Sequence, residues 1–167
     1  PPPAPQNMGS ASMWDAFQHI LLFISLYVLA MSVGLTLHLF VDNWVPNVTD
    51  EIAQYAMTWQ KMMLRGYIAA IIVAYPMFAI LFWRVTKRTT DNPSLRSLKS
   101  RKTLIYFTLI ITFLILIGQT IHTIYTLLSG NISLNFLLHL IVTMGISSII
   151  FAYYLHQVKE DRAYEKI

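Results

Sequence analysis

The sequence predicts an all-α integral membrane protein in which four spanning helices form a bundle. The 167-residue chain is 56% apolar and only 12% charged, whereas soluble domains contain about 25% charged residues. Every Asp, Glu, Lys and Arg lies outside four apolar stretches or at their ends, and residues 103–158 contain none. Each stretch approaches the roughly 20 helical residues that cross a hydrocarbon core about 30 Å thick.

The order of segments along the chain follows from these apolar stretches. The Pro-rich start cannot pack well and is expected to be a flexible tail. The long uncharged region after Lys102 divides at the turn sequence Ser129-Gly130-Asn131, which gives the third and fourth spans. The predicted organisation is a tail at 1–15, a transmembrane domain at 16–158 with spans near 16–41, 66–84, 103–128 and 132–157, and a C-terminal stub at 159–167.

The loop between the second and third spans is strongly basic and contains a single acid, Asp91. Short basic loops face the cytoplasm, so both termini are predicted to be cytoplasmic in a multi-pass protein of the cell (inner) membrane. The same basic side chains could bind anionic lipid headgroups. Nucleic acid is a poor candidate partner, because the loop lies beside the bilayer and carries no recognition motif. The basic residues are Arg84, Lys87, Arg88, Arg96, Lys99, Arg101 and Lys102.

A further helix is predicted in the first outer loop, residues 42–65. Thr49-Asp50-Glu51 is typical of a helix start, with a capping hydroxyl and acids in the first turn, and apolar residues follow at helical spacing. This segment is expected to be either a short interfacial helix or an outward extension of the second span.

The second span carries a stripe of small residues and an interior proline. Gly66, Ala70 and Ala74 recur every four residues, which lets another helix approach closely. Pro76 is expected to kink the helix, because its ring removes one backbone hydrogen bond. Such a break can build a substrate site in a transporter, but the span has no acid or base within it.

The third and fourth spans carry polar stripes. Asn135, His139, Thr143 and Ser147 recur every four residues and therefore share one helix face, and Gln119 belongs to a similar set in the third span. The two spans are joined by a tight turn and must run antiparallel. We expect a hydrogen-bonded hairpin in which each interhelical bond contributes about 0.6 to 2 kcal/mol.

Three histidines fall in the outer half of the predicted bundle. His122 and His139 lie roughly 10 Å inside the outer boundary and His38 about 6 Å inside it, at about 1.5 Å per helical residue. Ionisable groups within the membrane are candidates for function. Facing imidazoles could bind haem b or form part of a quinone site, although the helix faces do not require all three histidines to converge. Our first expectation is that no cofactor is bound.

Catalytic patterns are missing from the predicted spans. The chain contains no cysteine, so it offers no thiolate nucleophile and no thiolate metal ligand. No Asp or Glu is expected at membrane depth to orient a histidine, activate water or ligate a metal. The sequence therefore predicts neither a metal site nor an enzyme.

Several segments resemble one known family. Residues 64–78 (LRGYIAAIIVAYPMF) are similar to its second helix, and the third-to-fourth hairpin is similar at 116–119 (LIGQ), 127–130 (LLSG), 136–138 (FLL) and 151–155 (FAYYL). The family is a prokaryotic group of four-helix membrane domains known as domain of unknown function 5671. The resemblance implies a prokaryotic multi-pass membrane protein and supplies no catalytic residues.

Three functional hypotheses follow. The first is a non-enzymatic accessory or scaffold subunit of a larger membrane complex, with other membrane subunits as partners. The second is an electron-transfer subunit that binds haem b or quinone through His122 and His139. The third is a small transporter.

Overall fold

The computed structural model describes residues 8–46 and 50–166 of the chain. Within them, four helices are long and apolar enough to cross a membrane. This confirms the predicted all-α fold and its four apolar helices, and identifies a multi-pass membrane protein. The elements are α1 (Met8–Trp44), α2 (Asp50–Asp91), a 3₁₀ turn η1 (Pro93–Ser97), α3 (Lys99–Leu128) and α4 (Leu134–Glu165).

The helices are longer than the predicted spans. α1 begins at Met8, so it includes half of the segment predicted as a flexible tail, while residues 1–7 lie outside the described residues. α2 is continuous from Asp50, so the outer segment is an extension of the second span and not a separate interfacial helix. Its predicted cap, Thr49, lies outside the described residues. α4 continues to Glu165, through most of the predicted C-terminal stub.

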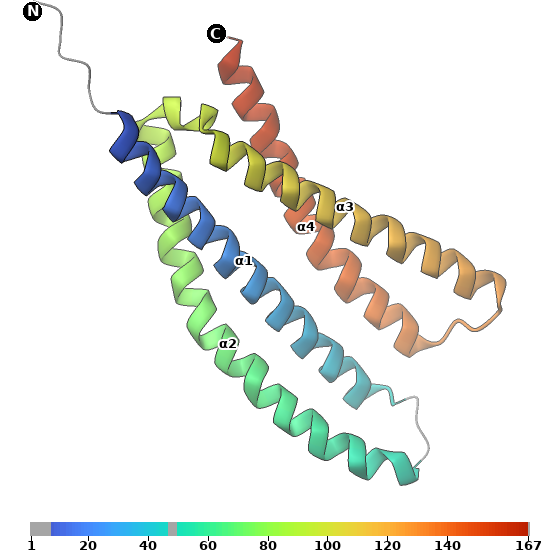
Figure 1. The fold of residues 1–167 in the computed structure, drawn as a ribbon. Helices are drawn as coiled ribbons and strands as arrows, with labels where there is room; N and C mark the ends of the chain where they lie inside the picture. The colour runs from blue at the N-terminus through green and yellow to red at the C-terminus, as the bar shows by residue number, and fades with distance from the viewer. Residues whose placement is uncertain (1–7, 47–49, 167) are drawn as a thin grey trace, which may run out of the picture.

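The helices form two antiparallel pairs, α1 with α2 and α3 with α4 (Figure 1). Among the described residues, α1 also packs against α3 and α4, whereas the α2 backbone approaches only α1 and η1. α2 follows a curved path (Figure 1), as expected for a helix with Pro76 in its interior. We call the end of the bundle that holds both hairpin turns the outer end, and the opposite end the inner end.

The apolar core lies toward the inner end of the bundle. Its buried members come from three helices, and the rings of Phe23 and Tyr154 lie 5.2 Å apart between centroids. Most other large apolar side chains are exposed, which suits a surface that faces lipid. The core cluster consists of Phe23, Leu26, Ile105, Leu109 and Tyr154.

The polar hairpin predicted between α3 and α4 takes a different form. On α3, the Thr123 hydroxyl donates to the Gln119 carbonyl at 2.7 Å, within its own helix. On α4, the side chains of His139 and Thr143 contact α1. The side-chain hydrogen bonds of His139 and Thr143 therefore join α4 to α1 and not to α3, which corrects the expectation for these two residues.

The residues predicted to pack helices have unequal surroundings. Ala74 is buried and Ala70 partly buried, whereas Gly66 is exposed and has open space where a Cβ would lie. Ser147 and Asn135 are buried, and Gln119 is partly exposed. Close packing along the α2 stripe is thus limited to the part nearest the middle of the bundle.

Candidate functional site

Four polar side chains from α1 and α4 form a continuous chain of hydrogen bonds at the outer end. Asp42 Oδ1 lies 2.7 Å from His139 Nε2, and His139 Nδ1 lies 2.5 Å from His38 Nδ1. His38 Nε2 lies 3.2 Å from the Thr143 hydroxyl. We call Asp42, His139, His38 and Thr143 the histidine chain.

The carboxylate fixes one proton of the histidine chain, and neutral rings fix the others. Because an ionised Asp42 can only accept, His139 Nε2 donates to it, and in a neutral His139 ring Nδ1 accepts from His38. His38 Nε2 is then left to accept from Thr143. Every donor therefore meets an acceptor while both imidazoles are neutral. The amide of Asn135 donates to Asp42 Oδ1 at 3.3 Å and to the Val45 carbonyl at 2.8 Å, which holds the carboxylate in place.

The helical repeat explains why these residues meet. His38 and Asp42 are four residues apart on α1, and Asn135, His139 and Thr143 follow at the same spacing on α4. Residues four apart share a helix face, so two matching faces come together where α1 and α4 pack. Sequence reasoning missed Asp42, because it was assigned to the loop after the first span. The prediction excluded an orienting carboxylate only at membrane depth, and it did not foresee the contact of Asp42 with His139 at the end of the span. The signal was the spacing of Asp42 from His38.

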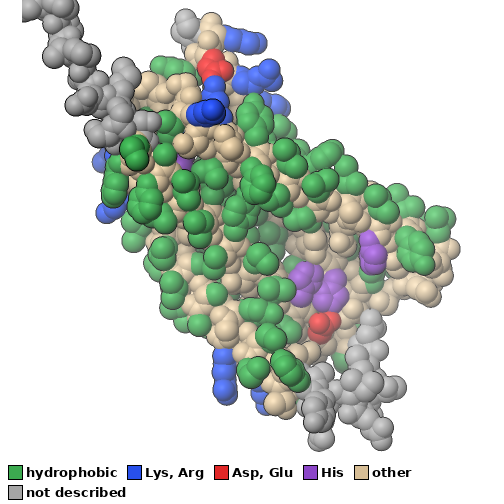
Figure 2. All heavy atoms as spheres, viewed as in Figure 1, with side chains coloured by type: hydrophobic (Ala, Val, Ile, Leu, Met, Phe, Trp, Pro, Cys, Tyr) green, Lys and Arg blue, Asp and Glu red, His purple; other side chains and the backbone are tan. Residues whose placement is uncertain are grey.

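His122 lies on α3 and does not join the histidine chain. Its ring packs against Phe136, with centroids 5.5 Å apart. Together with Gln119 it lines a cleft of about 560 Å³ that also borders His38 and His139. Among the described residues, neither Gln119 nor His122 has a side-chain hydrogen bond to protein. Figure 2 shows histidines gathered at a hollowed part of this end, with an acidic side chain beside them.

A second, apolar groove continues from this cleft between α1, α3 and α4. Its volume is about 520 Å³, and His38 and Thr143 border both the groove and the cleft. The helices come close beside Gly34, where an added Cβ would lie 3.4 Å from Ile146 Cδ1. The other side chains that line the groove include Ala30, Ile111, Ile115 and Val142.

The geometry does not fit a haem held by two histidines. Both ring nitrogens of His139 are engaged, one by Asp42 and one by His38. The 2.5 Å between His38 and His139 nitrogens leaves no space for an iron ion between them, and His122 faces Phe136. Within the described residues, no group of three or more His, Cys, Asp or Glu side chains could hold a metal ion. A polar cleft beside an apolar groove fits a quinone better, since a quinone has a polar head and an apolar tail.

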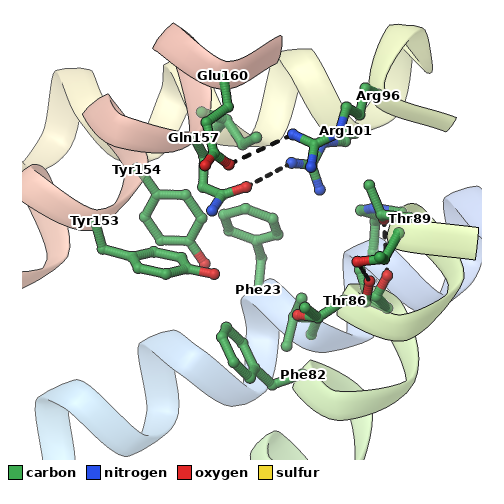
Figure 3. A pocket seen from close by; sticks show the side chains of 15 residues that line it. Phe23, Phe82, Thr86, Thr89, Arg96, Arg101, Tyr153, Tyr154, Gln157 and Glu160 are labelled. Carbon is green, nitrogen blue, oxygen red and sulfur yellow. Dashed lines mark hydrogen bonds and ion pairs between the residues drawn. The ribbon is translucent and has the colours of Figure 1, made fainter. Parts of the chain in front are cut away.

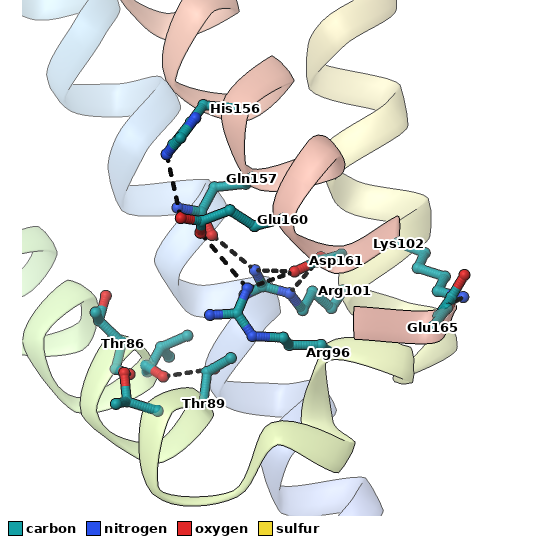
Figure 4. A network of polar contacts seen from close by, with 12 residues as sticks. Thr86, Thr89, Arg96, Arg101, Lys102, His156, Gln157, Glu160, Asp161 and Glu165 are labelled. Carbon is teal, nitrogen blue, oxygen red and sulfur yellow. Dashed lines mark hydrogen bonds and ion pairs between the residues drawn. The ribbon is translucent and has the colours of Figure 1, made fainter. Parts of the chain in front are cut away.

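A second polar cluster closes the inner end. Arg101 is only 6% exposed, and its Nε lies 3.1 Å from Asp161 Oδ2. Its Nη2 donates to Gln157 at 3.0 Å, and Arg96 Nη1 donates to Asp161 Oδ1 at 2.9 Å (Figure 4). Arg88 pairs with Asp15 at 3.1 Å. These contacts fasten α3, η1 and α2 to the ends of α4 and α1.

The basic residues predicted to contact lipid headgroups therefore have different roles. Arg101 is buried against Asp161 and is not available to a headgroup at the surface, which corrects that prediction. Arg88, Arg96 and Lys102 form ion pairs with acids of α1 and α4. Of these predicted residues, the exposed ones outside the ion pairs are Arg84, Lys87 and Lys99. The Nζ atom of Lys87 lies 5.2 Å from the centre of the Trp83 ring.

The comparisons with known proteins agree with the resemblance noted in the sequence. The profile of a family described as domain of unknown function (DUF5671) matches residues 15–154. No curated protein and no solved structure matches the chain. The matched segment contains all four residues of the histidine chain and both sides of the apolar groove. The chain belongs to the DUF5671 family of membrane domains.

Proposed function

We propose that this protein is a non-enzymatic accessory subunit of a membrane assembly and that it binds a quinone. The quinone head would lie in the polar cleft and its tail in the apolar groove. The observation that carries the proposal is the continuity of the two spaces at His38 and Thr143. In this proposal both termini are cytoplasmic, which the basic loop between α2 and α3 supports.

The size and chemistry of the two spaces support such a ligand. Volumes of about 520 and 560 Å³ fall within the roughly 300–1,000 Å³ of known ligand pockets. Gln119 and His122 carry donors and acceptors without protein partners in the described structure. Polar groups left unsatisfied near lipid are costly. Quinone carbonyls would accept hydrogen bonds from these side chains while the groove covers an isoprenoid tail.

The histidine chain would orient the polar wall of the site. Asp42 is 45% exposed in its side chain, so the chain runs from the outer surface to the groove. The hydrogen bonds that His38 makes with His139 and Thr143 keep its ring in one orientation beside the ligand. The side chains that contact the quinone head would therefore already be ordered before binding, which lowers the entropy cost of ordering them.

Replacing His139 by Ala is expected to weaken quinone binding by about tenfold or more. The variant loses the hydrogen bonds of the histidine chain, and a loss of about 1.4 kcal/mol raises the dissociation constant tenfold. The protein would be placed in lipid nanodiscs and titrated with decylubiquinone, and the dissociation constant measured by calorimetry. His156→Ala is the matched control, because His156 is exposed at the inner end and pairs with Glu160 at 3.2 Å. Equal binding by all three proteins would contradict the proposed site.

The accessory role is tested separately by the mass of the native particle. In the part of the chain that the structure describes, the α2 backbone packs only on α1 and η1. Its outer part exposes Trp59, Met62 and Gly66, which supports a partner on that side. Gentle detergent extraction from native membranes followed by native mass measurement should give a particle that contains other membrane chains. A lone monomer would count against the accessory role and leave quinone binding untouched.

A further inference from the structure

A smaller cavity of about 190 Å³ lies at the inner end, on the far side of the core from the groove. We call it the inner cavity. The guanidinium groups of Arg96 and Arg101, the hydroxyl-bearing residues Thr86 and Thr89 and the amide of Gln157 lie around it (Figure 3). Phe23, Phe82, Tyr153 and Tyr154 form its aromatic walls.

His19 also lines the inner cavity, and one of its ring nitrogens is buried without a partner in the described structure. The residue is 3% exposed, and its Nδ1 lies 2.7 Å from the Asp15 carbonyl oxygen, to which it must donate. Its Nε2 is buried and, in the part of the chain that the structure describes, is the one buried side-chain nitrogen or oxygen without a partner. A neutral ring presents a lone pair at Nε2. A buried acceptor of this kind costs free energy unless a donor reaches it, so an occupant of the cavity should carry a hydroxyl group.

The two arginines retain donors for the same occupant. The hydrogen bonds of Arg101 within the described structure use Nε and Nη2, and those of Arg96 use Nη1. Arg101 Nη1 and Arg96 Nη2 are therefore left to meet an acceptor. Planar guanidinium groups bind phosphate oxygens especially well. The Glu160 carboxylate also borders the cavity, and it pairs with Arg96 at 3.6 Å.

We propose that the inner cavity binds a phosphate group that carries a nearby hydroxyl donor. The phosphate oxygens would accept from Arg96 and Arg101, and the hydroxyl would donate to His19 Nε2. A phosphatidylglycerol headgroup and a free hydrogen phosphate ion share this chemistry. A volume of about 190 Å³ is below the roughly 300 Å³ at which drug-sized pockets begin, so it suits a headgroup-sized fragment.

The helix arrangement gives a lipid headgroup a route to the cavity. The backbones of α2 and α4 do not approach each other, and the rings of Phe82 and Tyr153 bridge them at 5.7 Å between centroids. These two rings border the cavity. A headgroup that enters sideways from the bilayer between α2 and α4 would therefore have to displace side chains but no backbone, while its acyl chains stay in lipid.

The test compares variants in nanodiscs of phosphatidylcholine with and without phosphatidylglycerol. Phosphatidylglycerol should raise the Tm of the natural protein, and Arg96→Gln and His19→Leu should each lose at least half of that rise. Lys99→Gln removes an equal charge from the same basic region but does not border the cavity, so it should keep the rise. His19→Leu tests the site without removing any charge from Arg96 or Arg101.

Inorganic phosphate, added to the nanodiscs that contain only phosphatidylcholine, distinguishes the two sources. A rise in Tm with inorganic phosphate alone identifies the free ion as the ligand, and a rise only with phosphatidylglycerol identifies the headgroup. An equal loss in Lys99→Gln and Arg96→Gln would show diffuse charge attraction and overturn the proposal. No effect of either phosphate source on the natural protein would overturn it as well.

Discussion

Replacing Asp161 by Asn is expected to lower the free energy of unfolding by about 3–5 kcal/mol, the usual cost of removing one partner of a buried ion pair. Asp161 accepts from Arg101 at 3.1 Å and from Arg96 at 2.9 Å, and Arg101 is only 6% exposed. The amide of Asn cannot balance a buried guanidinium charge. Chemical denaturation in detergent micelles, followed by circular dichroism, measures the change.

The matched control is Glu165→Gln at the same end of α4. Glu165 pairs with Lys102, and both side chains are more than a third exposed, at 40% and 38%. Exposed pairs contribute about 0.2–1 kcal/mol, so this variant should change stability little. Equal losses for the two variants would contradict the structural role assigned to the buried pair.

Replacing Gly34 by Leu is expected to block the apolar groove and weaken quinone binding by at least about tenfold, or about 1.4 kcal/mol. Even an added Cβ would lie 3.4 Å from Ile146 Cδ1, so the longer side chain must fill the groove or push α1 away from α4. Overpacking of this kind costs about 1–3 kcal/mol of stability. Quinone titration and chemical denaturation measure the two effects on the same protein.

Gly118→Leu is the control for this variant. Gly118 is on α3, is exposed, and has nothing within 4 Å of the position that a Cβ would take. It should therefore keep both binding and stability. If Gly34→Leu retained the affinity of the natural protein, the ligand would not occupy the groove between α1 and α4.

The fold could be predicted from the sequence because lipid imposes a simple pattern. Long stretches without charge must cross the bilayer as helices, and the turn at Ser129-Gly130-Asn131 divides the last two. Helix ends were less predictable. α1 starts earlier than predicted, and α4 extends through most of the predicted stub. On α4, Asp161 and Glu165 form ion pairs with η1 and α3, and these pairs stabilise the charged extension.

The histidines of the candidate site were predictable, but Asp42 and the pairing of the histidines were not. His38 and His139 were each identified by depth, yet the predicted pair was His122 with His139. Which histidines meet depends on how each helix is rotated about its axis. Because apolar residues lie on most sides of these helices, the sequence pattern does not indicate that rotation. The spacing of His38 and Asp42 was the missing clue, because it places an acid beside the histidine on the face that packs against α4.

The inner polar cluster was missed for a different reason. The basic loop was visible in the sequence, but it was interpreted as evidence about sidedness and about contact with lipid headgroups. Arg101 is followed by a long apolar helix, and its partner Asp161 lies 60 residues away. Such a long-range pair has no local spacing that would reveal it.

The most direct test of quinone binding is the quinone content of the protein as purified from its native membrane. Organic extraction and mass spectrometry should find about one quinone per chain, as expected for a single ligand groove, and much less in Gly34→Leu but not in Gly118→Leu. Recovery of phospholipid alone, with no quinone above the level of a control membrane protein, would contradict the proposed function.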